Sequence, residues 1–252
     1  MNARFKLISL SAFLASSISI FTATVQAASI MVMSDSPLEP ALTKVVDLYR
    51  QQTHNQVILV FAPSPVVKKR IEGGEAADVV IVQPDFAEDL TESGKVNAGD
   101  RPIIAHVGVG LGNRKDAPVY DIPTVEKLKN TLLGADLIAF NSVKSGQAFA
   151  NALERLGIAE TLKPKIVRTA PNDIFEPVLK GKGNDMVAGT IPLIATTPGI
   201  KLLGPLPGDL QSTLTYTVVL MANSAQRDTA EGFIKFMMSP QAKEIFAANG
   251  AK

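Results

Sequence analysis

The sequence has 252 residues, 46% of them hydrophobic and 19% charged, which is enough for one large domain or two smaller lobes around a substantial core. The formal net charge is +1, and the absence of any basic arm or large basic patch excludes nucleic acid as a partner. The chain contains no cysteine, which excludes disulfides, thiolate metal sites, cysteine catalysis and a lipid anchor on an N-terminal cysteine.

Residues 1–27 have the pattern of a cleavable secretory signal peptide. Arg4 and Lys6 form a short basic start, an apolar stretch follows, and Val25-Gln26-Ala27 gives a small-x-small cleavage signal. The apolar stretch is short for a membrane anchor, and no later segment has the length and apolarity of a span. Because cleavage removes two basic residues, we expect a mature protein with a net charge of about −1, soluble and periplasmic.

After the signal peptide, strand-like and helix-like segments alternate. Apolar periodicity predicts strands at 30–33, 57–61 and 78–82, and helices at 37–52, 65–72 and 86–93. Such alternation is typical of a largely parallel sheet with helices on its faces.

A second run of the same alternation follows. It predicts strands at 106–111, 137–140, 165–167 and 185–189, and helices at 123–133, 146–156 and 174–179. A long strand at 214–221 and helices at 228–238 and 240–248 complete the chain, whereas the Pro/Gly-rich segment 198–207 is predicted to be a loop.

Two strands are candidate crossovers between two lobes. The glycine-bearing strand at 107–112 and the long strand near Tyr216 could act as hinges for domain closure. We therefore expect lobe 1 to contain residues 28–106 plus 216–252, and lobe 2 to contain residues 107–215.

Small polar residues stand at the start of four predicted helices. Any one of them is uninformative, because most helices have such a cap, and Ser36 with Glu39 also fits a capping box. All four fall at or near strand-to-helix junctions, the edge of an α/β sheet where ligands bind. Since helix N-termini offer free N–H groups and a positive dipole end, together they could hold an anion without lysine or arginine. The four are Ser36, Ser64, Ser145-Gly146 and Asn172-Asp173.

Three segments resemble the type II periplasmic solute-binding proteins, in particular the molybdate-binding branch. They are Arg70 to Ile81 (RIEGGEAADVVI), Leu153 to Ile158 (LERLGI) and Phe233 to Ala242 (FIKFMMSPQA). The resemblance covers nearly the whole mature chain and implies an α/β protein of two lobes. Each lobe would be a mostly parallel sheet flanked by helices, with the cleft between them. It also implies a monomer, without cofactor or metal, that closes on a small anion and presents it to an ABC permease in the inner membrane.

The resemblance also implies a set of binding residues. Molybdate binders hold the oxyanion with serine hydroxyls, backbone N–H groups at helix starts and a tyrosine. The tyrosine position falls near Thr190 to Pro192, where this chain has none, so both a metal oxyanion and a small di- or tricarboxylate stay open as ligands. The residues carried over are Ser34 or Ser36, Ser64, Ser145, Gly146, Asn172, Asp173 and Thr190.

An enzyme on the same scaffold is the alternative. An aconitate isomerase is among the proteins that this chain resembles, and an isomerase needs a general base near an acidic carbon-bound proton. The candidates are Lys144, His106, Asp35 and Glu39, none of which the sequence distinguishes as catalytic. A receptor that signals to a membrane sensor is a third, weaker interpretation. Nucleophile-elbow, zinc-protease and P-loop motifs are absent, and only two histidines argue against a catalytic transition metal.

Overall fold

The computed structural model describes residues 28–97, 99–171 and 173–252, so the predicted signal peptide lies outside the described residues. The strands are β1 (Ser29–Ser34), β2 (Gln56–Phe61), β3 (Val79–Val82), β4 (Ile103–Arg114), β5 (Leu137–Asn141), β6 (Ile166–Thr169), β7 (Asp185–Thr190), β8 (Ile200–Pro205) and β9 (Thr213–Leu220). The helices are α1 (Glu39–Thr53), α2 (Ser64–Glu72), α3 (Pro84–Glu92), α4 (Val125–Leu133), α5 (Lys144–Arg155), α6 (Ala159–Leu162), α7 (Glu176–Lys180), α8 (Ile191–Thr196), α9 (Arg227–Met237) and α10 (Pro240–Ala248). Short 3₁₀ turns are η1 (Ser36–Leu38), η2 (Lys163–Lys165) and η3 (Gly208–Leu210). None of the described helices has the length and apolarity needed to cross a membrane.

Two sets of parallel strands with the same internal order form the sheet. The strand order is β2-β1-β3-β9-β4-β7-β5-β6, with β8 paired to β4 outside this path. β1 lies parallel between β2 and β3, and β5 lies parallel between β6 and β7. The expected two-lobed α/β fold with mostly parallel sheets is confirmed. In such sheets ligands bind outside the carboxyl ends of the strands, where the strand order reverses, which points to the residues after β1 and β5.

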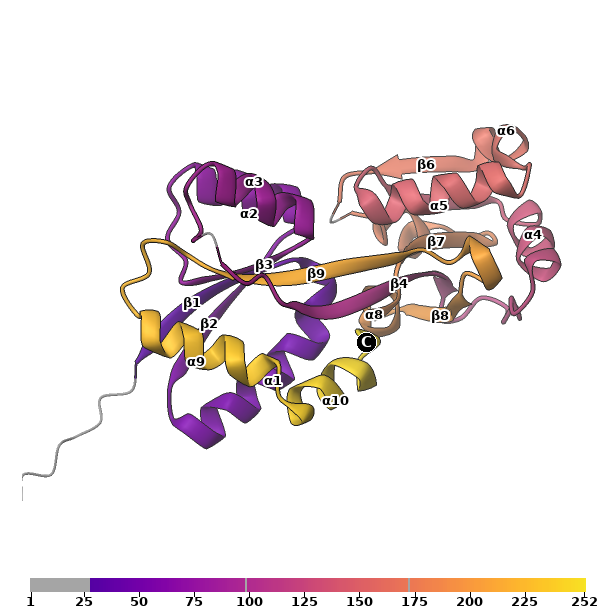
Figure 1. Ribbon diagram of the computed structural model, residues 1–252. Coiled ribbons are helices and arrows are strands. Elements are labelled where there is room, and N and C mark those ends of the chain that lie inside the picture. The colour runs from indigo at the N-terminus through magenta and orange to yellow at the C-terminus, as the bar shows by residue number, and fades with distance from the viewer. Residues whose placement is uncertain (1–27, 98, 172) are drawn as a thin grey trace, which may run out of the picture.

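Two long antiparallel strands connect the two lobes (Figure 1). β4 pairs with β9 through its first half, and with β7 and β8 through its second half. β9 also pairs with β3. The lobe boundaries predicted from the sequence, after residues 106 and 215, fall inside these two strands, and that exact division stays a prediction.

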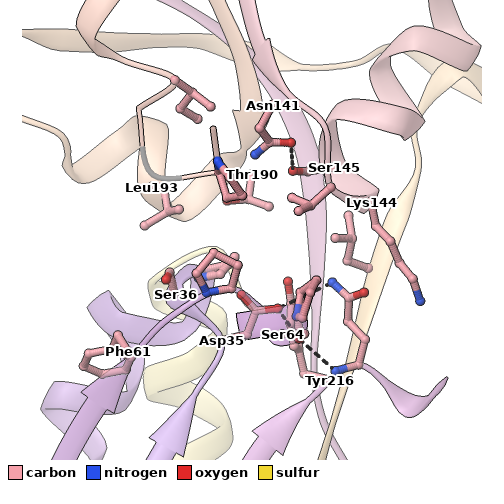
Figure 2. A pocket seen from close by; sticks show the side chains of 18 of the residues that line it. Asp35, Ser36, Phe61, Ser64, Asn141, Lys144, Ser145, Thr190, Leu193 and Tyr216 are labelled. Atoms are coloured by element: carbon pink, nitrogen blue, oxygen red, sulfur yellow. Dashed lines mark hydrogen bonds between the residues drawn. The ribbon is translucent and has the colours of Figure 1, made fainter. Parts of the chain in front are cut away.

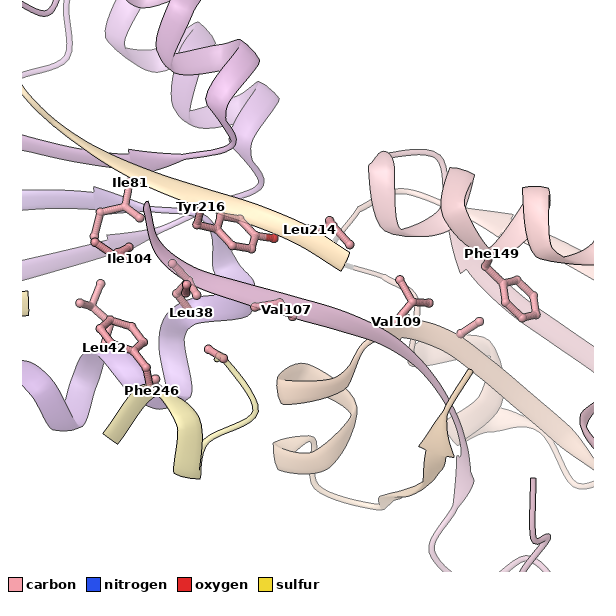
Figure 3. Packing of buried hydrophobic residues seen from close by; sticks show 14 of the residues in the cluster. Leu38, Leu42, Ile81, Ile104, Val107, Val109, Phe149, Leu214, Tyr216 and Phe246 are labelled. Carbon is pink, nitrogen blue, oxygen red and sulfur yellow. The ribbon is translucent and has the colours of Figure 1, made fainter. Parts of the chain in front are cut away.

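The largest apolar core runs through both lobes. Buried apolar residues of α1, including Leu42, pack with Phe246 of α10 and with Tyr216 of β9 in one continuous cluster (Figure 3). The same cluster extends along β4 to Phe140 and Phe149, whose rings meet edge to face at 5.1 Å between centroids. The crossing strands are therefore held by packing as well as by backbone hydrogen bonds.

The composition of segment 198–207 predicted a loop, and this prediction is wrong. The segment contains β8, which pairs antiparallel with β4. The pairing is close because β4 carries glycines: a Cβ on Gly112 would lie 2.8 Å from the Lys201 carbonyl oxygen, and one on Gly110 would lie 2.9 Å from that of Gly204. Contacts between distant segments here override the local preference of proline and glycine for irregular structure. The short helices α6 and α8 were not predicted either.

Candidate functional site

A cavity of about 580 Å³ lies between the two sets of parallel strands, at their carboxyl ends (Figure 2). Polar residues of the first lobe and of β9 line one side: Asp35, Ser36, Glu39, Ser64, Gln83 and Tyr216. Polar residues of the second lobe line the other side: Asn141, Ser142, Lys144, Ser145, Gln147 and Thr190. Much of the remaining wall is carbon: Phe61, Phe86, Ile174, Phe175, Leu193, Leu214 and several prolines.

The predicted N-caps do not cap their helices. The N-cap positions are Leu38 for α1, Pro63 for α2, Val143 for α5 and Phe175 for α7, and none has a side-chain cap bond. The capping box of Ser36 and Glu39 is wrong because Ser36-Pro37-Leu38 forms the separate turn η1 and Glu39 is the first residue of α1. Among the other helices, Thr124 caps α4 by accepting the N–H of Lys127, and Ser239 caps α10 by accepting the N–H of Ala242.

Of the predicted binding residues that the structure describes, four line the cavity and three do not. Ser36, Ser64, Ser145 and Thr190 are part of the lining. Ser34 is fully buried beneath it, with its hydroxyl donating to the Asp35 carbonyl oxygen at 3.2 Å. Gly146 is buried behind the wall, Asp173 is exposed outside it, and Asn172 lies outside the described residues.

Asp35 is the most unusual group in the cavity. It follows the central strand β1, and its side chain is buried, with only 4% of the residue exposed. Burial raises the pKa of its carboxyl to about 6. The Ser64 hydroxyl, the backbone N–H groups of Ser64 and Ser36, and the charge of Lys144 lower the pKa, but by less than burial raises it. Asp35 is therefore a buried cavity carboxyl with a pKa of about 6.

The Ser64 hydroxyl already has both of its partners inside the protein. It donates its hydrogen to the Asp35 carboxylate and accepts the backbone N–H of Gln83 at 3.2 Å. A hydroxyl has a single hydrogen to donate, so Ser64 has none left for a ligand while this bond persists. The side-chain amide of Gln83 also reaches Asp35, at 3.5 Å. Ser64 lies in the predicted place, but its hydroxyl serves Asp35.

On the opposite side, Asn141 organises the start of α5. Asn141 is the last residue of the central strand β5, and its amide oxygen accepts the Ser145 hydroxyl at 3.3 Å and the Gly146 N–H at 3.1 Å. The Gly146 N–H was expected to contact an anion, but it is directed at a protein side chain. Glycine is required there, because a Cβ would lie 1.9 Å from the Asn141 carbonyl oxygen.

Three buried polar atoms of the cavity wall have no hydrogen-bond partner among the described residues. They are the hydroxyls of Thr190 and Tyr216 and the amide oxygen of Gln83. Buried polar groups are normally paired, so these atoms are candidates for contact with a ligand. Burial and the charge of Asp35 raise the pKa of Tyr216 well above its usual value, and the nearby Gln83 side chain, which forms no hydrogen bond of normal geometry with it, lowers the pKa by less, so the hydroxyl stays a neutral donor.

A tyrosine was expected near residues 190–192, and Tyr216 was not among the predicted site residues. Tyr216 is supplied by the crossing strand β9 instead. The sequence signal is weak: a tyrosine between two threonines in an apolar strand reads equally well as core.

The other candidate bases differ in position. Glu39 and Lys144 line the cavity, but Lys144 forms an ion pair with Asp85 of α3 and lies 5.3 Å from the ring centre of Phe86. His106 is exposed outside the cavity, with Nδ1 3.1 Å from the Thr215 hydroxyl. Within the described part of the chain, no three His, Cys, Asp or Glu side chains gather as a metal site would require.

Comparison with known proteins identifies the class. The model of the bacterial extracellular solute-binding protein family matches residues 30–252, and the chain belongs to this family. It is 22% identical over 227 residues to an aconitate isomerase from Pseudomonas sp, covering 88% of this chain and 86% of that one. It is also 22% identical to the molybdate-binding protein ModA of Escherichia coli (strain K12), covering 88% of each. The periplasmic molybdate-binding protein of Azotobacter vinelandii has the same fold, with a TM-score of 0.75, 19% identity, and coverage of 88% and 98%.

Proposed function

We propose that this protein is the periplasmic receptor of an ABC importer and that its two lobes close on a small organic acid. The family, the fold and the cavity between the two sets of strand ends all support a receptor that encloses its ligand. Export by the predicted signal peptide would place it in the periplasm. Delivery to a permease in the inner membrane follows from the same proposal.

The observation that carries the proposal is the combination of carbon-rich walls with unpartnered polar atoms on both sides of the cavity. A volume of about 580 Å³ is in the range of sites that hold organic molecules. Phe61, Phe86 and Leu193 offer surface to a carbon skeleton, whereas the hydroxyls of Thr190 and Tyr216 offer donors to its oxygens. A di- or tricarboxylate matches both features better than a bare metal oxyanion does.

A thermal-shift screen of residues 28–252 tests this proposal. The panel contains molybdate, tungstate, sulfate, phosphate, citrate, and cis- and trans-aconitate. A ligand that binds only the folded state raises the melting temperature by mass action. We expect a shift with at least one of the organic acids and none with molybdate or tungstate. A shift with the metal oxyanions alone would refute the organic-acid assignment.

Proton transfer within the same cavity is a second candidate function, and Asp35 favours it. A general base works best when its pKa lies near the operating pH, and the Asp35 carboxyl has a pKa of about 6. In an unsaturated tricarboxylate, Asp35 would take the proton of the CH₂ group next to the double bond. The electron pair would spread over the allylic system and its carboxylate, and Asp35 would return the proton to the far allylic carbon. The double bond moves, and no other reactant is consumed.

An absorbance assay with cis- and trans-aconitate separates the two functions. If the protein is an isomerase, we expect turnover by the wild type and loss of turnover in Asp35→Asn. The control Asp47→Asn, which removes an exposed carboxylate on α1, should leave turnover unchanged. Binding of an aconitate without turnover would leave the receptor as the function and exclude the enzyme.

A further inference from the structure

We propose that Asp35 determines which ligands this cavity accepts, because its own carboxylate occupies the anion position beside the start of α2. The cavity then takes acids that bring a hydrogen-bond donor to Asp35, such as hydroxy acids or polycarboxylic acids that retain a proton. It excludes bare, fully ionised tetrahedral oxyanions. This inference rests on the proposed function, since it concerns the same cavity.

The hydrogen-bond donors on this side of the cavity are already directed at Asp35. From the sequence we expect the Ser64 hydroxyl and neighbouring N–H groups to hold an external anion. In the structure the Ser64 hydroxyl donates to Asp35, the side chain of Gln83 approaches the same oxygen at 3.5 Å, and the N–H groups of Ser64 and Ser36 also favour the ionised carboxylate. The protein's own anion therefore already uses the donors on this side of the cavity.

The charges around Asp35 disfavour a second anion beside it. Two titratable groups act on Asp35 from other elements: Lys144 of α5 and Tyr216 of β9. Tyr216 is neutral, and Lys144 is paired with Asp85 at the rim. Within the described chain Asp35 has no salt bridge, so a second unprotonated anion beside it would meet repulsion in a poorly solvated site.

The polar groups of the cavity determine which functional groups the ligand must carry. Asp35 accepts a hydrogen bond, so the ligand group that touches it must carry a hydrogen. The unpartnered hydroxyls of Tyr216 and Thr190 can donate to carboxylate oxygens of the same molecule. Figure 2 shows Thr190 facing Asp35 and Tyr216 across the cavity, so one small acid can meet all three. The matching ligand carries both an acceptor carboxylate and a hydroxyl or a retained acid proton.

The test is a gain of function measured by calorimetric titration near neutral pH. Wild type, Asp35→Ala and Asp35→Asn are titrated with sodium molybdate and with citrate, and Asp47→Ala is the control that removes a carboxylate outside the cavity. We expect no molybdate binding by wild type or Asp47→Ala. Asp35→Ala should bind molybdate at least about tenfold more tightly than wild type and citrate at least about tenfold more weakly.

Two results would overturn the inference: molybdate binding by the wild type as tight as by Asp35→Ala, or no gain of molybdate binding in either Asp35 variant. If Asp35→Ala fails to fold, Asp35→Asn keeps the test, because it removes the charge with almost the same shape. Failure of this inference can be distinguished from failure of the proposed function. The proposed function fails if the wild type binds no organic acid, and that result does not depend on how the variants bind molybdate.

Discussion

Asp35 acquires its properties from residues distant in the sequence. Its hydrogen-bond partners Ser64 and Gln83 lie 29 and 48 residues further along the chain. The sequence could therefore name Asp35 among four candidate bases but could not distinguish it, since burial and these partners exist only in the fold. For the same reason the sequence did not reveal that the Ser64 hydroxyl, which lines the cavity, donates to Asp35.

The raised pKa of Asp35 predicts a pH-dependent stability. Its carboxyl titrates at about 6 in the folded chain and at 3.8 as a model compound, so between these values the folded state binds more protons. The contribution of Asp35 to the free energy of unfolding is therefore greatest below pH 3.8 and is lost as the pH rises through about 6.

Asp35→Asn should remove this loss. Urea denaturation should find the variant more stable than wild type near pH about 8, by about 2 to 3 kcal/mol, with a much smaller difference near pH about 4. A stability difference that is the same at both pH values would show that Asp35 is not destabilised by its charge.

Gly146 offers a second test at the scale of one residue. Gly146→Ala places a Cβ 1.9 Å from the Asn141 carbonyl oxygen, whereas in Gly134→Ala the nearest atom is 3.5 Å away. We expect Gly146→Ala to lower the free energy of unfolding by at least about 2 kcal/mol, and Gly134→Ala to change it by less than about 1 kcal/mol. Equal effects in denaturant titrations would contradict the close contact between α5 and the end of β5.

At the scale of elements, the sequence predicted the alternation of strands and helices well, with shifts of a few residues at most ends. Apolar periodicity marks which face of an element is buried, as for Leu42, Val45 and Tyr49 of α1. It does not reveal pairing between distant segments, so β8 was missed. It also does not locate helix starts exactly: α2 begins at Ser64 itself, and Ser36 belongs to the separate turn η1.

The cap of α4 is the element-scale prediction. The Thr124 hydroxyl accepts the Lys127 N–H at 3.2 Å. Thr124→Ala should lower the free energy of unfolding by about 1 kcal/mol. Thr124→Ser should retain most of the stabilisation that the cap provides, because the serine hydroxyl can still accept the N–H. Thermal and urea unfolding of the three proteins measure this, and a serine variant as unstable as the alanine variant would argue against capping.

At the scale of the whole molecule, both lobes place polar residues after a central strand, β1 or β5, while β4 and β9 join them (Figure 1). The resemblance of sequence motifs sufficed to predict this architecture. It could not predict the chemistry of the cavity, because its polar atoms come from segments as distant as Asp35, Asn141, Thr190 and Tyr216. The tyrosine expected near residue 190 is absent, and the tyrosine that does line the cavity, Tyr216 of β9, lies across it from Thr190.

The ion pair of Lys144 and Asp85 joins α5 to α3 across the rim of the cavity. About half of each side chain is exposed, so water and salt weaken the attraction. A double-mutant cycle with Lys144→Ala and Asp85→Ala should give a coupling energy below about 1 kcal/mol, decreasing as salt is added. A much larger, salt-independent coupling would mean that this pair holds the lobes together.

The central claim is that one small organic acid is held from both sides of the cavity. The most direct test is the calorimetric affinity of residues 28–252 for the panel acid that gives the largest thermal shift, measured for wild type, Thr190→Val and Tyr216→Phe. We predict that each substitution weakens binding about tenfold, the effect of one lost hydrogen bond to a charged group. Unchanged affinity in both variants would contradict the account and place the ligand elsewhere.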